Sequence, residues 1–126
     1  MVASALEANG FEPRLLDLCF ARRPEQDIER TISEFGPDCV GLSVRNLDNG
    51  EYGAPRAYLP EVARTIQAVR RHSGAPVIIG GPAVGMAPER VLKALAADWA
   101  VAGEGEAVFS RVIEAVRDGR SPIGLP

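Results

Sequence analysis

The chain has 126 residues, of which 46% are hydrophobic and 25% are charged, and its formal net charge at pH 7 is -3. This composition fits one globular domain with a buried core, and the weak negative charge argues against a surface that neutralises nucleic-acid phosphates. No apolar run approaches the ~20 residues of a membrane span and the amino terminus does not resemble a signal peptide, so we expect a cytoplasmic protein.

Helical and strand-like segments alternate along the sequence. The first helix ends at Asn9-Gly10, a pair that favours left-handed backbone, and the second begins with Pro24 at its first position. Later segments show either an apolar stripe at helical spacing or a short, continuously apolar run. We expect helices over 2–8, 24–35, 58–72 and 106–118 and one that begins at Pro88, and strands over 14–18, 39–44, 76–79 and 99–102.

Strands separated by helical connections predict an α/β fold, namely a flavodoxin-like (Rossmann-type) doubly wound parallel sheet in three layers, α/β/α. Such a sheet, in the strand order 2-1-3-4-5, begins with a strand near its middle, whereas this chain begins at the helix that follows it. Either the chain is a fragment, or another segment or another copy fills the position. An open position predicts oligomerisation or strand exchange. We expect the domain to span 1–118, with a flexible tail over 119–126.

Three of the predicted strands end in small or acidic residues. Because parallel strands deliver their carboxyl ends to one edge of the sheet, these residues are expected to converge there as a binding site. Glycines admit a ligand close to the backbone, although a turn that needs positive φ is the better explanation of Gly80-Gly81 when the pair is taken alone. The candidate residues are Leu42, Ser43, Val44, Arg45 and Asn46 after one strand, Gly80 and Gly81 after the next, and Gly103, Glu104, Gly105 and Glu106 after the last.

The sequence shows no catalytic constellation. It contains no nucleophile with a base, no pair of carboxylates at strand ends and no Walker-type phosphate loop. The single histidine, His72, is expected on the opposite edge of the sheet. Cys19 and Cys39 have neither CxxC spacing nor a nearby histidine, so we expect buried thiols and no metal site.

Three segments together resemble the cobalamin-binding domains found at the amino terminus of cobalamin-dependent radical SAM proteins. They are the runs over 37–49, over 77–82 with 88–92 after it, and over 97–106. In this order and spacing they are fairly specific, and the resemblance spans roughly residues 10–116. It implies that the corrin ring lies over the carboxyl edge while the nucleotide tail enters a slot of small residues.

By position, the resemblance implies that Leu42, Ser43 and Val44 line the tail, that Gly80 and Gly81 make room for it, and that 103–106 meet its other side. The Asp-x-His-x-x-Gly motif, whose histidine ligates cobalt in many cobalamin domains, is absent. No Cys-x-x-x-Cys-x-x-Cys run is present either, so an iron-sulfur cluster is not expected on this chain. The resemblance therefore implies a cobalamin-binding module whose partner is a separate radical SAM catalytic domain.

Other functions remain open at this stage. A protein-interaction domain of the same fold that has lost its ligand is the main alternative, and the absent strand and histidine support it. An FMN or nucleotide binder fits poorly because its phosphate loop belongs after the first strand. A receiver domain also fits poorly, because the strand that ends at Ser43 offers no aspartate there.

Overall fold

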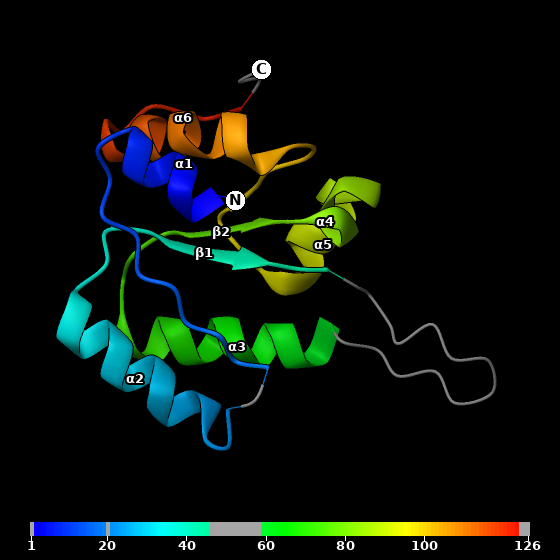
Figure 1. Cartoon of the computed structure of the whole chain (residues 1–126). Helices are drawn as coiled ribbons and strands as arrows, with labels where there is room; N and C mark the ends of the chain where they lie inside the picture. The colour runs from blue at the N-terminus through cyan, green and yellow to red at the C-terminus, as the bar shows by residue number, and fades with distance from the viewer. Residues whose placement is uncertain (1, 20, 46–58, 124–126) are drawn as a thin grey trace.

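The fold is a parallel sheet with helices on both faces (Figure 1). The computed structural model describes residues 2–19, 21–45 and 59–123. In this part of the chain the strands follow the order β1-β2-β3, and both pairings are parallel. The elements are α1 (Val2–Ala8), α2 (Pro24–Phe35), β1 (Val40–Ser43), α3 (Leu59–His72), β2 (Val77–Gly80), α4 (Pro82–Met86), α5 (Pro88–Leu95), β3 (Trp99–Ala100) and α6 (Gly105–Arg117).

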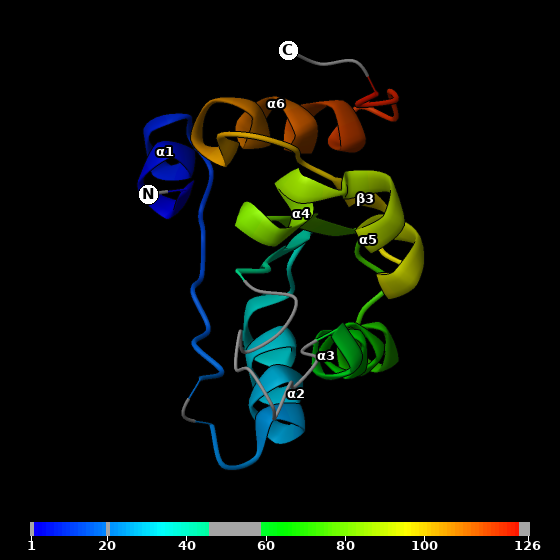
Figure 2. The same ribbon diagram turned by 90° about the vertical axis from the view of Figure 1, so that its right-hand side faces the viewer.

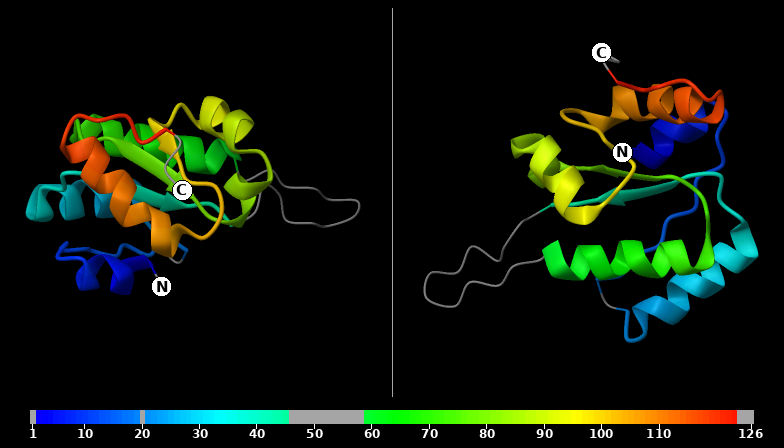
Figure 3. Two further views of the ribbon diagram at one scale, coloured as in Figure 1. Left: turned by 90° about the horizontal axis from the view of Figure 1, so that it is seen from above. Right: turned by 180° about the vertical axis from the view of Figure 1, so that it is seen from behind.

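Helices α1 and α6 lie on one side of the sheet, and α2 and α3 lie on the other (Figure 1). Seen from above, α6 crosses the sheet and α1 lies beyond β1 (Figure 3). The predicted doubly wound α/β fold is confirmed. Helices α3 and α6, which follow β1 and β3, run back along the sheet toward the amino ends of the strands (Figure 1), as connections between parallel strands require.

The core centres on β2, whose residues Val77, Ile78 and Ile79 are fully buried. Successive side chains of a strand point to opposite faces. Ile79 accordingly belongs to the cluster that includes Ile66 of α3, and Ile78 belongs to the cluster that includes Val112 of α6. The central strand thus joins both helical layers.

Gly41 lets α6 pack closely on β1. A Cβ atom built on Gly41 would lie 2.8 Å from Cζ of Phe109, a distance shorter than any ordinary contact. The strand therefore presents bare backbone to the Phe109 ring. A larger residue here would force the ring or the helix to move.

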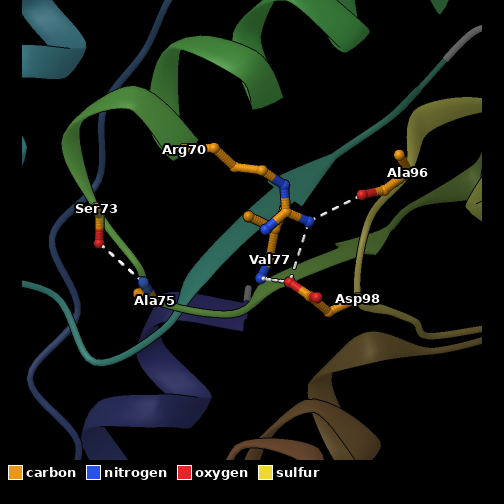
Figure 4. A network of polar contacts seen from close by, with 6 residues as sticks. All are labelled: Arg70, Ser73, Ala75, Val77, Ala96 and Asp98. Atoms are coloured by element: carbon orange, nitrogen blue, oxygen red, sulfur yellow. Dashed lines mark hydrogen bonds and ion pairs between the residues drawn. The ribbon is translucent and has the colours of Figure 1, made fainter.

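Arg70 and Asp98 form a polar network at the amino edge of the sheet (Figure 4). Asp98 Oδ2 accepts a hydrogen bond from the Val77 N–H at 2.7 Å, and Arg70 Nη2 lies 3.2 Å from the same oxygen. Arg70 Nη2 also donates to the Ala96 carbonyl at 2.8 Å. The network joins α3 to the first residues of β2 and to the turn before β3.

Two sequence predictions about the elements are corrected by the structure. Residues 14–18 form no strand, because an extended segment becomes part of a sheet only when its backbone groups find a partner. Helix α4 was not expected, although Pro82 at its first position is a typical helix start. The other predicted elements are present, and β3 is shorter than its predicted 99–102.

The predicted tail is partly tied to α6. Arg120 N–H donates to the Ala115 carbonyl at 2.8 Å, and Pro122 is buried. Residues 124–126 lie outside the described residues. The assignment of 119–126 as a flexible tail stays a prediction, with its first residues packed on the helix.

Candidate functional site

The carboxyl ends of the strands meet on one edge of the molecule. In Figure 1 the ends of β1 and β2, helix α4 and the amino end of α6 all lie on the right-hand side. Figure 2 looks onto this edge and shows α4 between α6 and α3. The predicted convergence of strand ends is therefore present in the fold.

Ser43 and Gly81 are direct neighbours at this edge. A Cβ atom built on Gly81 would lie 3.1 Å from Ser43 Oγ and only 2.7 Å from the Val44 carbonyl oxygen. Gly81 also has a φ of 104°, which favours glycine. The end of β1 thus occupies the space that a side chain at Gly81 would need, and the close approach of β1 and β2 alone requires this glycine.

Helix α4 connects this contact to the loop after β3. The N–H of Gly103 lies 3.9 Å from a Cβ atom built on Gly85, so a glycine of α4 faces a glycine of the loop. Met86, at the end of the same helix, is 80% exposed. Sequence reasoning missed both Gly85 and Met86, and the Pro82 start signal followed by a glycine was the sign that could have found them.

The loop over 103–106 presents exposed backbone at the start of α6. Gly103 has a φ of 93°, and a Cβ atom built on it meets no atom within 4 Å. Glu104 precedes the first turn of α6 and is exposed, while Glu106 in that turn complements the helix dipole. The loop therefore combines open space at Gly103 with the start of a helix, whose first amide groups have no acceptor within the helix.

The core uses several of the predicted site residues. Val44 is 2% exposed, and its N–H and C=O are bonded to Gly80 at 2.8 Å and to Ala83 at 3.1 Å. Leu42 packs against the core cluster, and a Cβ atom built on Gly80 would be in ordinary contact with Val101. Val44, Leu42 and Gly80 can therefore contribute to a site through their backbone groups and through the shape that they give the edge. Arg45 is exposed just beyond β1, and Asn46 lies outside the described residues.

His72 and Cys39 lie away from this edge of the sheet. His72 ends α3 before the amino end of β2, on the opposite edge, as the sequence predicts. Cys39, before β1, is partly buried, and burial with the nearby carboxylates of Asp38 and Asp98 raises its pKa to about 11. Cys19 is exposed, which corrects the expectation that both thiols are buried, because its segment pairs with no strand.

Within residues 2–19, 21–45 and 59–123, no group of three or more His, Cys, Asp or Glu side chains is arranged to hold a metal ion. None of the helices in this part of the chain combines the length and apolar character of a membrane span.

The carboxyl edge fits a large ligand with both apolar and polar parts. Its surface includes backbone with open space around it at Gly103, the exposed residue Ser43 and the exposed apolar side chain of Met86. A ligand can approach such a surface closely because few side chains stand in the way.

Two curated proteins are similar to this chain. It is 30% identical over 125 residues to tryptophan 2-C-methyltransferase of Streptomyces laurentii, and the alignment covers 96% of this chain and 20% of that protein. It is also 30% identical over 100 residues to an uncharacterised methyltransferase of Pyrococcus horikoshii, covering 79% of this chain and 20% of that protein. The chain thus spans about a fifth of the length of these relatives.

Two solved structures of the radical S-adenosylmethionine methyltransferase TsrM from Kitasatospora setae superpose on this chain with a TM-score of 0.92 and 31% identity. One holds tryptophan and a SAM analogue, and the other holds cobalamin and a [4Fe-4S] cluster. The alignments cover 99% of this chain and 23% and 22% of those chains. The B12 binding domain profile matches residues 1–113. The chain therefore belongs to the B12-binding domain family.

Proposed function

We propose that this chain is the cobalamin-holding part of a larger radical SAM methyltransferase, and that a separate catalytic domain carries out the reaction. Support comes from the family match over residues 1–113 and from relatives that are methyltransferases about five times as long. The observation that carries the proposal is that Ser43 and Gly81 are neighbours at the carboxyl edge of a B12-binding fold, and that Gly85 of α4 joins them to the loop at Gly103.

The residues of the carboxyl edge have distinct roles in this proposal. Ser43 donates or accepts a hydrogen bond to a polar group of the cofactor, while Gly81 keeps the ends of β1 and β2 close together. The loop over 103–106 offers backbone amides, and Met86 offers apolar surface. The remaining candidates Leu42, Val44, Arg45, Asn46 and Gly80 shape the same edge. Bound cobalamin supplies the cobalt chemistry of group transfer or radical reactions.

Retention of cobalamin by the full chain tests the proposal. The protein is mixed with hydroxocobalamin and desalted, and its visible spectrum is recorded. We expect corrin absorbance to remain with the protein. Ser43→Leu is expected to weaken binding at least about tenfold by filling the edge and removing the hydroxyl. Ser33→Leu, an exposed position on α2, is the matched control and should bind normally.

An empty protein after desalting, with the fold intact by circular dichroism, would contradict the proposal. It would favour the second candidate, a protein-interaction domain of the same fold. The observation behind this candidate is that β1, in the described part of the chain, is an outer strand that pairs with β2 on one side and has no strand on the other.

The proposal also includes the cellular compartment of the enzyme. Both described cysteines are free thiols, and the cytoplasm is the compartment that keeps thiols reduced. We therefore place the enzyme in the cytoplasm. Self-association through the open sheet stays a prediction, and sedimentation velocity at increasing concentrations of the chain measures it.

A further inference from the structure

The contact between Gly41 and Phe109 is closer than the backbone of β1 by itself requires. Gly41 lies within β1 and is not one of the glycines with a positive φ, so its backbone conformation would accept alanine. A Cβ atom built on it nevertheless lies 2.8 Å from Phe109 Cζ, whereas ordinary contacts begin at 3.4 Å. The aromatic ring, and not the backbone, therefore excludes a side chain at this position.

Phe109 lies one helical turn from the loop over 103–106. Phe109 and Val108 pack against the core cluster that contains Ile78 of β2 and Val112 of α6. Gly105, at which α6 begins, is about 6 Å from Phe109 along the helix axis. Because a helix is rigid over one turn, the distance between Phe109 and β1 also sets how far the start of α6 lies from the sheet.

The loop over 103–106 has few contacts of its own that could fix its position. Glu104, which precedes the first turn of α6, makes no side-chain hydrogen bond to that turn. No backbone hydrogen bond joins residues 102–104 to β1, β2 or α4, all of which belong to the described part of the chain. A Cβ atom built on Gly103 meets nothing within 4 Å, and Gly103 N lies 3.9 Å from a Cβ atom built on Gly85. The position of the loop is therefore set by the elements that it connects, which are β3 and α6.

We propose that Phe109 is a positioning residue for the carboxyl edge. Its ring, seated on the bare backbone of Gly41, fixes the start of α6 and thereby holds the loop over 103–106 beside Gly85 of α4. A site for a rigid ligand needs its parts within about 0.5 Å of their binding positions, so a small retreat of the helix is enough to weaken binding. The inference rests on the proposed function only where it assigns the loop to cobalamin, since the position of the loop is measurable without the cofactor.

A methyl group added at Gly41 can be accommodated in two ways. Either the ring of Phe109 rotates within the core cluster, or α6 retreats from β1. The ring is packed against buried residues, and a close-packed interior offers little space for a different rotamer. We therefore expect the helix to move and the loop to move with it.

Three variants and a control test the assignment in the full chain without cofactor. Gly41→Ala introduces the overlap, Phe109→Leu removes the ring, and the double variant Gly41→Ala/Phe109→Leu exchanges one for the other. Gly74→Ala is the matched control, because Gly74 has no positive φ and a Cβ atom built on it meets nothing within 4 Å.

The nuclear Overhauser effect between the Gly103 amide proton and the α protons of Gly85 reports the position of the loop directly. We expect this signal to lose intensity in Gly41→Ala and in Phe109→Leu, and to regain it in the double variant, because the two changes compensate each other only if the ring and Gly41 act through one contact. The Gly74→Ala control should retain the intensity of the unmodified chain.

Titration with hydroxocobalamin, followed by the visible spectrum, is the second measurement. We expect Gly41→Ala to bind at least about tenfold more weakly than the unmodified chain, and the double variant to bind within about threefold of it. Urea unfolding of the same variants establishes that each is fully folded under the conditions of the titration, so that weaker binding reports the site and not the stability.

An unchanged signal between Gly103 and Gly85 in a folded Gly41→Ala would show that the ring rotates, and it would overturn the proposal. A signal that the double variant does not recover would overturn it as well. If Gly41→Ala does not fold, Phe109→Leu decides, because an unchanged signal there means that the ring does not set the loop. Failure of the unmodified chain to bind cobalamin would contradict the proposed function instead, and the signal would still decide the role of Phe109.

Discussion

At the residue scale, Gly81 is a glycine that the packing of the fold requires, at a position where the sequence pattern suggested contact with a ligand. Its conformation, with a φ of 104°, and the Val44 carbonyl 2.7 Å from a built Cβ atom both exclude a side chain. The sequence pattern Gly80-Gly81 after a buried strand predicted the glycine's location correctly. It could not show that β1, rather than empty space, lies opposite it, because that contact joins residues far apart in the sequence.

Gly81→Ala is expected to lower the free energy of unfolding by about 3 kcal/mol, because it combines backbone strain with a steric overlap. Gly85→Ala is the matched control, since its built Cβ atom approaches only Gly103 N, at 3.9 Å, and alanine favours the helix. Urea unfolding followed by circular dichroism measures both. Equal stability of the two variants would show that β1 does not restrict Gly81.

Cys39 is a second residue whose chemistry the fold alters. Burial, with Asp38 and Asp98 nearby, raises the pKa of its thiol from 9.0 to about 11, so the folded protein holds this proton more tightly than the unfolded chain. The stability that the neutral thiol contributes is therefore complete below pH 9 and is lost as the pH rises toward 11.

The expected outcome is a steeper loss of stability between pH 9 and 11 in the unmodified chain than in Cys39→Ala. Urea unfolding at pH 8, 9.5 and 10.5 measures it. Cys19→Ala, at an exposed thiol, is the matched control and should retain the steep loss. Parallel pH profiles for the unmodified chain and Cys39→Ala would contradict the assignment.

At the scale of elements, the amino edge depends on one carboxylate. Asp98 accepts a hydrogen bond from the N–H of Val77, the first residue of β2, and also holds Arg70 of α3. Removing the carboxylate leaves a partly buried N–H without its acceptor, which costs more than the loss of an exposed ion pair.

We expect Asp98→Ala to lower the free energy of unfolding by about 2 kcal/mol and Arg70→Met by at most about 1 kcal/mol. Asp118→Ala, at an exposed aspartate that ends α6, is the control and should leave the free energy of unfolding nearly unchanged. Thermal and urea unfolding measure all three. A larger effect of Arg70→Met than of Asp98→Ala would assign the stabilisation to the ion pair instead.

The elements also show where sequence patterns suffice and where they fail. The apolar stripe of α2 and the continuous apolar run of β1 are local signals, and both elements lie close to where the sequence predicts them. Residues 14–18 also contain three leucines in five positions, yet they form no strand. Pairing is a property of two segments, so a pattern in one of them cannot establish it.

At the scale of the whole molecule, the predicted fold and the meeting of the strand ends are confirmed, because parallel topology alone brings those ends to one edge. The detailed lining of the edge was less predictable. Helix α4, with Gly85 and Met86, enters between the expected glycine turns because the chain turns into a short helix directly after β2. Its five residues give too little periodicity to be recognised from sequence.

The polar network of Arg70 and Asp98 makes one end of the sheet more rigid than the other. It braces α3, β2 and the approach to β3 at the end of the sheet that faces away from the glycine turns. On the opposite side, the described backbone bonds of Val44 with Gly80 and Ala83 tie β1 to its neighbours. The sheet is thus held rigid at the amino ends of its strands. We expect the changes that accommodate a bulky ligand to be concentrated at the carboxyl ends.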